Sequence, residues 1–196
     1  VMERTKVTNL IKSDHPIENV WVKGWVRTKR DAKSFSFIEL NDGSCLKNIQ
    51  IIVDETIDNY DAVKKITTGA ALAVRGKLVE SKGGGQQWEI QASQVDVISL
   101  APDTFPLQKK RHSDEFLRSI AHLRPRTNKY GAVFRIRSEL SFGVHQFFRQ
   151  RGFRYIQTPI ITGSDCEGAG ELFRVTTLNP SMPTPPAGKF DFANDF

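Results

Sequence analysis

The chain has 196 residues, of which 39% are hydrophobic and 26% are charged, a balance typical of a soluble globular protein of one or two domains with a sizeable core. It contains no run of about 18 apolar residues, and its first residues, VMERTKV, lack the basic and then apolar layout of a secretion signal, so we expect a cytosolic protein. The formal net charge of +6 favours an anionic partner. RNA or DNA is favoured over a membrane, because no basic amphipathic helix with a bulky apolar face stands out.

Residues 20–100 read as β-strands. Alternate positions of VWVKGWVRTK (20–29) are apolar, and Gly24 lies where a barrel strand can bend. FSFIEL (35–40) and NIQIIV (48–53) flank the turn NDGS, so we expect these two strands to form a hairpin.

A short helix and two more strands follow. DNYDAVKKI (58–66) is the predicted helix, with Asp58 as its N-cap. AALAVRGKLVES (70–81) and QWEIQASQVDVISL (87–100) are strands around the flexible tip KGGGQ (82–86). Five strands with a small helix between the third and the fourth match the order of an OB-fold barrel, whose second and third strands commonly bind oligonucleotides. A small barrel without that function is the alternative.

The strand FSFIEL has two aromatic residues on one face. If Ile38 and Leu40 point into the core, Phe35 and Phe37 point outward, and Gln50 of the next strand lies beside them. A nucleobase can stack on an aromatic ring, and an amide can read a base edge with a donor and an acceptor. We therefore predict that this face binds bases. The alternative is that the rings pack under a loop or against a second domain.

Basic residues close to FSFIEL in the sequence supply charge for phosphates. They are Arg27, Lys29, Arg30 and Lys33. A solvated basic face is the alternative.

The pattern changes after the barrel. Residues 100–127 contain three prolines, a basic cluster and little periodicity, which is typical of a linker. From Lys129 apolar residues recur at three- and four-residue steps, a helical pattern that ends near Gly152 at a C-cap position. These apolar positions are Val133, Ile136, Leu140, Val144, Phe147 and Phe148. FRYIQTPIIT (153–162) reads as a strand in which Pro159 belongs at an edge or an interface.

These patterns predict three parts. We expect an OB-fold domain over residues 1–102, a linker or hinge over 103–128, and the beginning of a second domain over 129–196. A proline-rich loop closes this last part, from residue 179. Cys45 and Cys166 are far apart and have no metal-ligand spacing with the four histidines, so we predict neither a disulfide framework nor a zinc site.

Several motifs resemble the class II aminoacyl-tRNA synthetases of the aspartate, asparagine and lysine subgroup, and within it the asparagine type. VWVKGWVRTKRD and FIELNDGS resemble the anticodon-binding barrel, and GFRYIQTPIIT resembles the end of motif 1 with its proline at Pro159. EGAGELFRVTTL (167–178) is the most specific match, and it separates the asparagine type from the aspartate type. The resemblance covers nearly the whole chain. It implies an OB-fold barrel followed by the opening α+β segment of an antiparallel-sheet catalytic domain.

The resemblance also assigns roles to residues of the barrel. It implies that Phe37 stacks on an anticodon base and that Gln50 hydrogen-bonds to one. Phe35, Arg27 and Lys29 are the further anticodon-binding residues that we expect beside them.

Motif 1 joins two subunits in this family, so the resemblance implies a homodimer. The expected interface residues are Phe147, Phe148 and Pro159. Core packing within the subunit is the alternative, and we expect it for three other residues of the stripe, Val133, Ile136 and Leu140.

The match places Glu167 where the family binds the α-ammonium group of the amino acid, with Ser164 at the same site. A carboxylate on a tight glycine turn can approach a cation closely and pair with it by a charge-assisted hydrogen bond. An ordinary exposed turn is the alternative.

The activity that the resemblance implies is the ATP-dependent activation of asparagine, with Mg²⁺, and its transfer to tRNA. The family supplies the catalytic groups from motifs 2 and 3, which are not found before residue 196, so no residue is assigned as catalytic or as a metal ligand. We expect this chain alone to be inactive in adenylate formation. GAGELFR (168–174) fits the motif 3 pattern but comes too early, so we do not take Arg174 as catalytic.

Two other functions remain open. The first is a related synthetase specific for aspartate or lysine. The second is a non-catalytic OB-fold RNA-binding protein, in which the helix after the barrel serves only for dimerisation.

Overall fold

The computed structural model describes residues 3–161 and Val175. The chain divides into two compact units, residues 1–144 and 145–196. In the described part of the chain, no helix combines the length and the apolar character needed to span a membrane.

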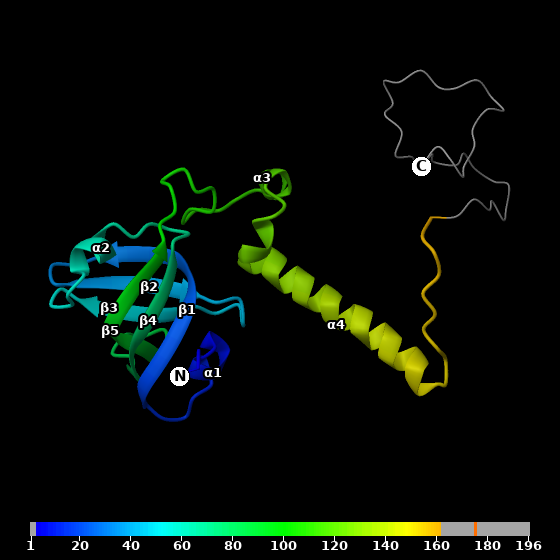
Figure 1. The fold of residues 1–196 in the computed structure, drawn as a ribbon, viewed down its shortest axis with the longest axis horizontal. Helices are drawn as coiled ribbons and strands as arrows, with labels where there is room; N and C mark the ends of the chain where they lie inside the picture. The colour runs from blue at the N-terminus through cyan, green and yellow to red at the C-terminus, as the bar shows by residue number, and fades with distance from the viewer. Residues whose placement is uncertain (1–2, 162–174, 176–196) are drawn as a thin grey trace, which may run out of the picture. The chain divides into compact units, whose positions relative to one another are not determined.

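A closed barrel of five strands forms the centre of the first unit (Figure 1). The strands are β1 (Ile17–Asp31), β2 (Phe35–Asn41), β3 (Ile49–Asp54), β4 (Ala71–Glu80) and β5 (Trp88–Ser99). Their order around the barrel is β1-β2-β3-β5-β4, and neighbours are antiparallel except β3 and β5, which are parallel. This is the OB-fold that the order of strands predicted.

Alternating apolar side chains build the core of the barrel. On β2, Ile38 and Leu40 are completely buried, whereas Phe35 is 39% exposed. Because side chains alternate along a strand, the residues between the buried ones face outward. The prediction that Ile38 and Leu40 face the core and that Phe35 faces outward is therefore confirmed. The same alternation buries Val20, Val22 and Val26 of β1 and Ile49, Ile51 and Val53 of β3.

Two glycines let the barrel strands approach each other closely. A Cβ atom at Gly24 would lie 2.6 Å from the backbone oxygen of Asn41 on β2, and one at Gly76 would overlap the backbone oxygen of Gln91 on β5. No side chain fits at such contacts. Gly24, which we expected at a bend, therefore also allows the backbones of β1 and β2 to come close together.

Helix α2 (Tyr60–Lys64) connects β3 and β4, as predicted, but its N-cap is Asn59 and not Asp58. The side-chain amide of Asn59 donates a 2.6 Å hydrogen bond to the backbone oxygen of Val95 on β5. This contact with a distant strand fixes the point where the helix begins, and no side chain caps it. The prediction of Asp58 as the cap is therefore wrong.

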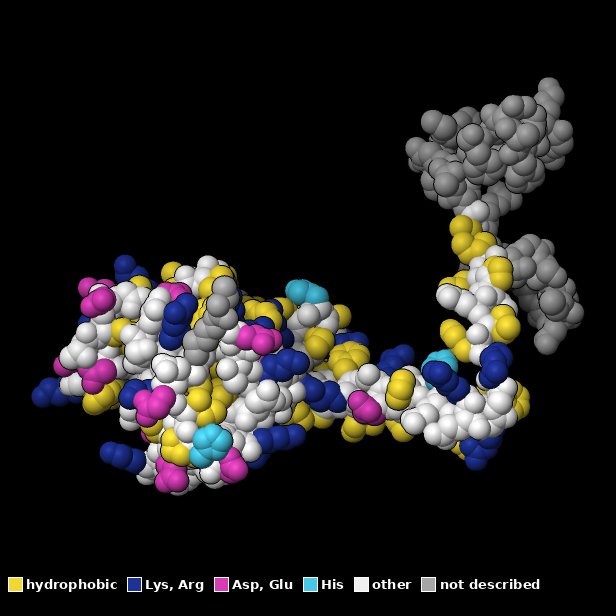
Figure 2. All heavy atoms as spheres, turned by 60° about the horizontal axis from the view of Figure 1, so that its bottom comes forward, with side chains coloured by type: hydrophobic (Ala, Val, Ile, Leu, Met, Phe, Trp, Pro, Cys, Tyr) yellow, Lys and Arg dark blue, Asp and Glu magenta, His cyan; other side chains and the backbone are white. Residues whose placement is uncertain are grey.

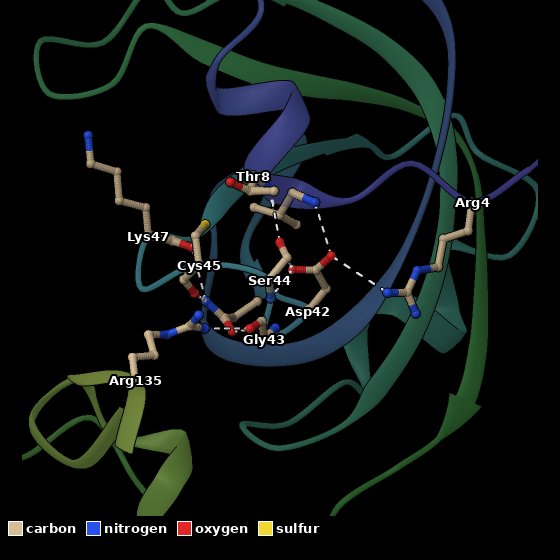
Figure 3. A network of polar contacts seen from close by, with 10 residues as sticks. Arg4, Thr8, Asp42, Gly43, Ser44, Cys45, Lys47 and Arg135 are labelled. Atoms are coloured by element: carbon tan, nitrogen blue, oxygen red, sulfur yellow. Dashed lines mark hydrogen bonds and ion pairs between the residues drawn. The ribbon is translucent and has the colours of Figure 1, made fainter. Parts of the chain in front are cut away.

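Helix α1 (Val7–Ile11) precedes the barrel and is held by the loop between β2 and β3 (Figure 3). An oxygen of Asp42 accepts a 3.0 Å hydrogen bond from the backbone nitrogen of Val7, and Oγ of Ser44 accepts one of 3.0 Å from Thr8. The groups that cap the helix thus come from a loop about 35 residues away. A local sequence pattern cannot predict such a helix.

The predicted linker contains regular structure. Residues 100–127 include helix α3 (Asp114–Ser119) and the 3-10 turn η1 (Arg124–Arg126). Oγ of Ser113 caps α3 by accepting a 3.2 Å hydrogen bond from the backbone nitrogen of Phe116. A helix of six residues is too short to leave a periodic apolar stripe in the sequence.

Helix α4 (Asn128–Gln150) confirms the helix predicted from Lys129, and Gly152 follows it with a φ of +85°. Its apolar stripe is exposed, and Leu140 reaches 66%. We expected Val133, Ile136 and Leu140 to pack in a core. In the part of the chain that the structure describes, no residue buries them, and there this expectation is wrong.

Residues 153–161 form neither a helix nor a strand. The prediction of a strand over 153–162 is therefore wrong for this segment. A strand persists only where a neighbouring strand satisfies its backbone groups, and none of the described residues pairs with this segment.

Candidate nucleic-acid interface

The outward side chains of four neighbouring strands form one continuous surface of the barrel. Strand register aligns Arg30 of β1 with Phe37 of β2 and Ile52 of β3 in one row. The next row aligns Glu39, Gln50 and Glu89 across β2, β3 and β5. Directly paired residues point to the same side of a sheet. We call this surface the β2 face, and it consists of Thr28, Arg30, Phe35, Phe37, Glu39, Gln50, Ile52, Asp54, Glu89 and Gln91.

Aromatic rings and a cation meet on the β2 face. Phe35 is exposed and Phe37 is half-buried. The guanidinium of Arg30 lies over the Phe37 ring, 4.9 Å from its centroid. Such a cation–π contact holds the planar guanidinium close to the ring. The face therefore offers a stacking surface with a positive charge beside it.

A row of polar groups crosses the same face. Nε2 of Gln50 donates a 3.2 Å hydrogen bond to Oε2 of Glu89, and Oγ of Ser81 donates one of 2.8 Å to the same oxygen. Nδ2 of Asn48 donates a 3.1 Å bond to Oε2 of Glu39. Gln50 lies on the face, as the sequence predicted. Glu89 was not identified, because the parallel pairing of β3 with β5 leaves no local signal in the sequence.

Arg27 of β1 contacts the residues at the start of α4. Its guanidinium donates to the backbone oxygen of Arg126 and, at 3.5 Å, to Oδ1 of Asn128, where α4 begins. Burial lowers the pKa of Arg27, the Glu39 carboxylate opposes this, and the nearby charge of Arg126 adds to the lowering. Arg27 therefore ties the barrel to the base of α4.

Lys29 points away from the β2 face. It pairs with Ile38, which is a core residue, so its side chain enters the inner side of the sheet and is only 8% exposed. Its ammonium donates to Oδ2 of Asp31 at 3.0 Å and to the backbone oxygen of Lys64 at 2.8 Å. The expectation that Lys29 lies beside the aromatic rings is therefore wrong.

A groove of about 950 Å³ adjoins the β2 face. Arg27, Thr28, Glu39 and Asn48 line it from the barrel, and the linker residues 107–114 line it from the other side. The linker contributes three consecutive exposed cations, Lys109, Lys110 and Arg111. These are the basic cluster of the predicted linker, and they can supply phosphate contacts that Lys29, whose side chain is turned to the inner side of the sheet, does not. Figure 2 shows one face of the molecule, on which basic and acidic side chains are interspersed over the barrel.

The predicted interface residues of motif 1 are exposed. The ring centroids of Phe147 and Phe148 lie 5.4 Å apart, and Phe153 lies 5.4 Å from Phe148, both edge-to-face. Phe147 and Phe148 remain nearly half exposed, and Pro159 is exposed too. Their role between subunits stays a prediction.

The predicted amino-acid-binding residues Ser164 and Glu167 lie outside the described residues, as do Cys166, Arg174 and the proline-rich loop. Cys45 is a free cysteine. Among the residues that the structure describes, no group of three or more histidine, cysteine or acidic side chains could hold a metal ion.

Two family models match the chain. The OB-fold nucleic acid binding domain matches residues 20–98, and the tRNA synthetases class II (D, K and N) match residues 113–184. The unmatched stretch between them, residues 99–112, overlaps the predicted linker over residues 103–112, and the exact boundaries at 102 and 128 stay predictions.

Curated relatives match over the whole length of the chain. The asparagine–tRNA ligase of Oleidesulfovibrio alaskensis is 59% identical over 196 residues, which are 100% of this chain and 42% of the relative. The asparagine–tRNA ligase of Nitratidesulfovibrio vulgaris is 58% identical over 197 residues, again 100% of this chain and 42% of the relative. The chain therefore spans about 42% of the length of these relatives.

Solved structures show the same fold. The crystal structure of asparaginyl-tRNA synthetase from Pyrococcus horikoshii complexed with asparaginyl-adenylate matches with a TM-score of 0.78 and 20% identity, over 90% of this chain and 41% of that chain. At this level of identity, the likeness concerns the fold alone.

Proposed function

We propose that this chain belongs to the class II tRNA synthetases of the aspartate, lysine and asparagine group, and that it is the anticodon-reading part of an asparagine–tRNA ligase together with the beginning of its catalytic domain. Similarity to ligases of that name, over the whole of this chain and about 42% of their length, supports the choice of asparagine over aspartate or lysine. The match of residues 113–184 to the synthetase family also favours this reading over a free-standing RNA-binding barrel.

The observation that carries the proposal is the β2 face. Phe35 and Phe37 present rings, and Gln50 presents an amide, on the outer surface of a barrel whose family binds nucleic acid. Unpaired anticodon bases offer both a flat face for stacking and an edge for hydrogen bonds. Arg30 and the linker cations of the adjoining groove would contact phosphates.

In the intact protein, we propose that ATP activates asparagine and that the asparaginyl group then passes to the tRNA. ATP and Mg²⁺ fit the family, but no described group of side chains suits a metal ion, so we derive no catalytic step from the described residues. We expect the 196-residue chain alone to show no asparagine-dependent exchange between ATP and pyrophosphate. The intact protein should show this exchange with asparagine and not with aspartate.

We further propose that the intact protein is a cytoplasmic homodimer. The exposed apolar stripe of α4 and the exposed rings of Phe147 and Phe148 support this assembly, because contiguous exposed apolar side chains often mark a surface that binds another protein.

Binding of a stem-loop RNA tests the proposed function. The chain is titrated with a stem-loop that carries the asparagine anticodon and with one whose anticodon is scrambled, each at two salt concentrations. We expect tighter binding of the cognate loop at both. Equal binding of both loops that weakens steeply with salt would mean that only phosphates are bound, and it would contradict the proposal.

A further inference from the structure

Two cations lie over the ring of Trp21 on the outside of the barrel. Nζ of Lys23 is 4.4 Å from the ring centroid, and Cζ of Arg75 is 5.5 Å from it. Arg75 of β4 is directly paired with Trp21, and Lys23 lies two positions along β1, so strand geometry places all three on the same side. Arg75 is exposed, and the other two are half-buried. This cluster lies outside both the β2 face and the groove.

The outer side of β1 continues this pattern up to the β2 face. Trp25 is 40% exposed, and Cζ of Arg126 from η1 lies 4.5 Å from its ring centroid. Farther along the strand, Arg30 lies over the Phe37 ring. Trp25 and Arg30 pair with residues on the same side of β2, because the register of β1 shifts by one position after Val26. We call this set the β1 row, and it consists of Trp21, Lys23, Trp25, Arg30, Phe37, Arg75 and Arg126.

The four cations of the β1 row have rings as partners and no carboxylates. Within residues 3–161, none of them forms an ion pair. A guanidinium that lies on a ring contacts it with its flat face and keeps its N–H donors for another acceptor. An ion-paired cation would first have to leave its carboxylate. The row therefore presents positive charge that is held in place and not neutralised.

The carboxylates beside the β1 row have partners of their own. Nε2 of Gln94 donates a 2.9 Å hydrogen bond to Oδ1 of Asp96 on β5. Oε2 of Glu18, near the start of β1, lies 2.6 Å from Nζ of Lys77. These acidic groups therefore border the row without neutralising its cations.

We propose that the β1 row binds the phosphate backbone of the RNA stem that carries the anticodon loop, as a second contact surface beside the β2 face. This inference rests on the proposed function, since it takes the loop to be bound at the β2 face. The row is continuous with that face at Arg30 and Phe37. From Arg30 to Trp21 it follows β1 for roughly 30 Å, at about 3.3 Å per residue.

The length of the β1 row favours a nucleic-acid backbone over a small anion. A backbone carries phosphates at regular intervals and can contact several separated cations at once, whereas a single anion can contact only one of the clusters. The rings restrict the rotamers of the cations before binding, so less side-chain entropy is lost when phosphates are bound.

The test compares two RNAs with the same cognate loop, one on a long stem and one on a stem of a few base pairs. We expect the long stem to be bound more tightly and with a steeper salt dependence. Arg75→Gln and Lys23→Gln should each lower the slope of log affinity against log salt by about 1 for the long stem. Binding of the short stem should not change, which also shows that the variants are folded.

Lys77→Gln is the matched control. It removes one charge from the next outward position of β4 after Arg75, but Lys77 is paired with Glu18. We expect it to leave the slope for the long stem as it is. If Arg75→Gln and Lys23→Gln behave like Lys77→Gln, the β1 row does not bind the stem and the inference is overturned.

Polyglutamate is the probe for an acidic protein as the alternative partner. We expect the wild-type chain to bind it much more weakly than the long stem. If polyglutamate is bound as tightly as the long stem, and Arg75→Gln abolishes this binding, the row is a site for an acidic protein and the inference is wrong.

The outcomes distinguish the inference from the proposed function. The preference for the cognate over the scrambled loop, measured on the short stem, tests the proposed function alone. A chain without this preference contradicts the proposed function and the inference with it. A chain that has the preference but binds long and short stems with equal affinity and equal salt dependence overturns only the inference.

Discussion

The guanidinium of Arg30 on β1 lies over the ring of Phe37 on β2, with 4.9 Å between its Cζ atom and the ring centroid. The two residues are directly paired in the sheet, so the contact follows from the strand register. The contact places the positive charge of Arg30 beside the Phe37 ring, on which we propose that a base stacks. We therefore expect base stacking to depend on Phe37 and phosphate binding to depend on Arg30. Substituting each residue separately distinguishes the two contributions.

Phe37→Ala should weaken binding of the cognate stem-loop by about 1–3 kcal/mol, because the base loses its stacking partner. Fluorescence anisotropy at fixed salt measures the change. Tyr155→Ala is the control, since this aromatic residue is 77% exposed and lies outside both the β2 face and the groove. Equal affinities of wild type and Phe37→Ala would contradict stacking at this ring.

Arg30→Gln should weaken binding of cognate and scrambled loops alike. If the guanidinium neutralises one phosphate, the slope of log affinity against log salt should fall by about 0.7 for a single strand. Lys29→Met should leave this slope unchanged and lower the stability of the barrel instead, because the Lys29 ammonium is bound to Asp31 and Lys64. A slope that changes with Lys29→Met and not with Arg30→Gln would reverse our assignment of the two charges.

Asp42 should stabilise the chain in a pH-dependent way. Burial raises the pKa of its carboxyl, but hydrogen bonds from Ser44 and from the backbone of Val7 outweigh this, together with the charge of Arg4, and the pKa lies below its ordinary value of 3.8. A lowered pKa adds stability above the unfolded value, and this stability is lost as the pH falls through the folded pKa.

Asp42→Asn should therefore lower the free energy of unfolding at pH 7 by about 1–3 kcal/mol and flatten its decline below about pH 4. Urea unfolding, measured at intervals of about one pH unit between about pH 2 and pH 7, gives the free energy of unfolding and its dependence on pH. Asp103→Asn removes an exposed carboxylate of the linker and should leave the profile as it is. A variant with wild-type stability at neutral pH would show that the loop does not hold α1.

Gly76→Ala should destabilise the barrel by more than about 1 kcal/mol, because its Cβ atom would overlap the backbone oxygen of Gln91 on the adjacent strand. Gly84→Ala is the control, since a Cβ atom there meets nothing within 4 Å. We expect the control to change the free energy of unfolding by less than about 0.5 kcal/mol. Similar losses in both variants would contradict the close strand approach.

The apolar stripe of α4 should make the chain self-associate. Ile136→Ser and Leu140→Ser, which replace residues 60% and 66% exposed, should shift the molecule toward the monomer in sedimentation experiments. Arg137→Ser, on the same helix but outside the stripe, should not. A wild-type chain that stays monomeric at high concentration would contradict the role of this surface.

Local patterns in the sequence were sufficient for the barrel strands and for α4. The alternation in FSFIEL correctly predicted that Phe35 and Phe37 face outward, because the pleat allows only two directions. Lys29 shows that closeness in sequence to the rings is not sufficient, because its pairing with Ile38 turns its side chain to the inner side of the sheet.

Contacts between distant segments could not be predicted from local patterns. Glu89 acquires its partners Gln50 and Ser81 only through the parallel pairing of β3 with β5 and the end of β4. Asn59 displaces Asp58 as the cap because it reaches β5. The stripe of α4 and the segment 153–161 were predicted as if their packing partners were present, and the described residues do not supply them.

Photocrosslinking tests most directly whether anticodon bases lie on the rings of β2. The chain is bound to the cognate stem-loop with 5-iodouridine at the anticodon positions, irradiated and digested, and the attached peptide is sequenced by mass spectrometry. We predict attachment to Phe37 or Phe35, and its loss when both are replaced by leucine. Attachment only to the linker cations Lys109, Lys110 and Arg111 would show that the bases lie elsewhere, and it would contradict anticodon reading by the β2 face.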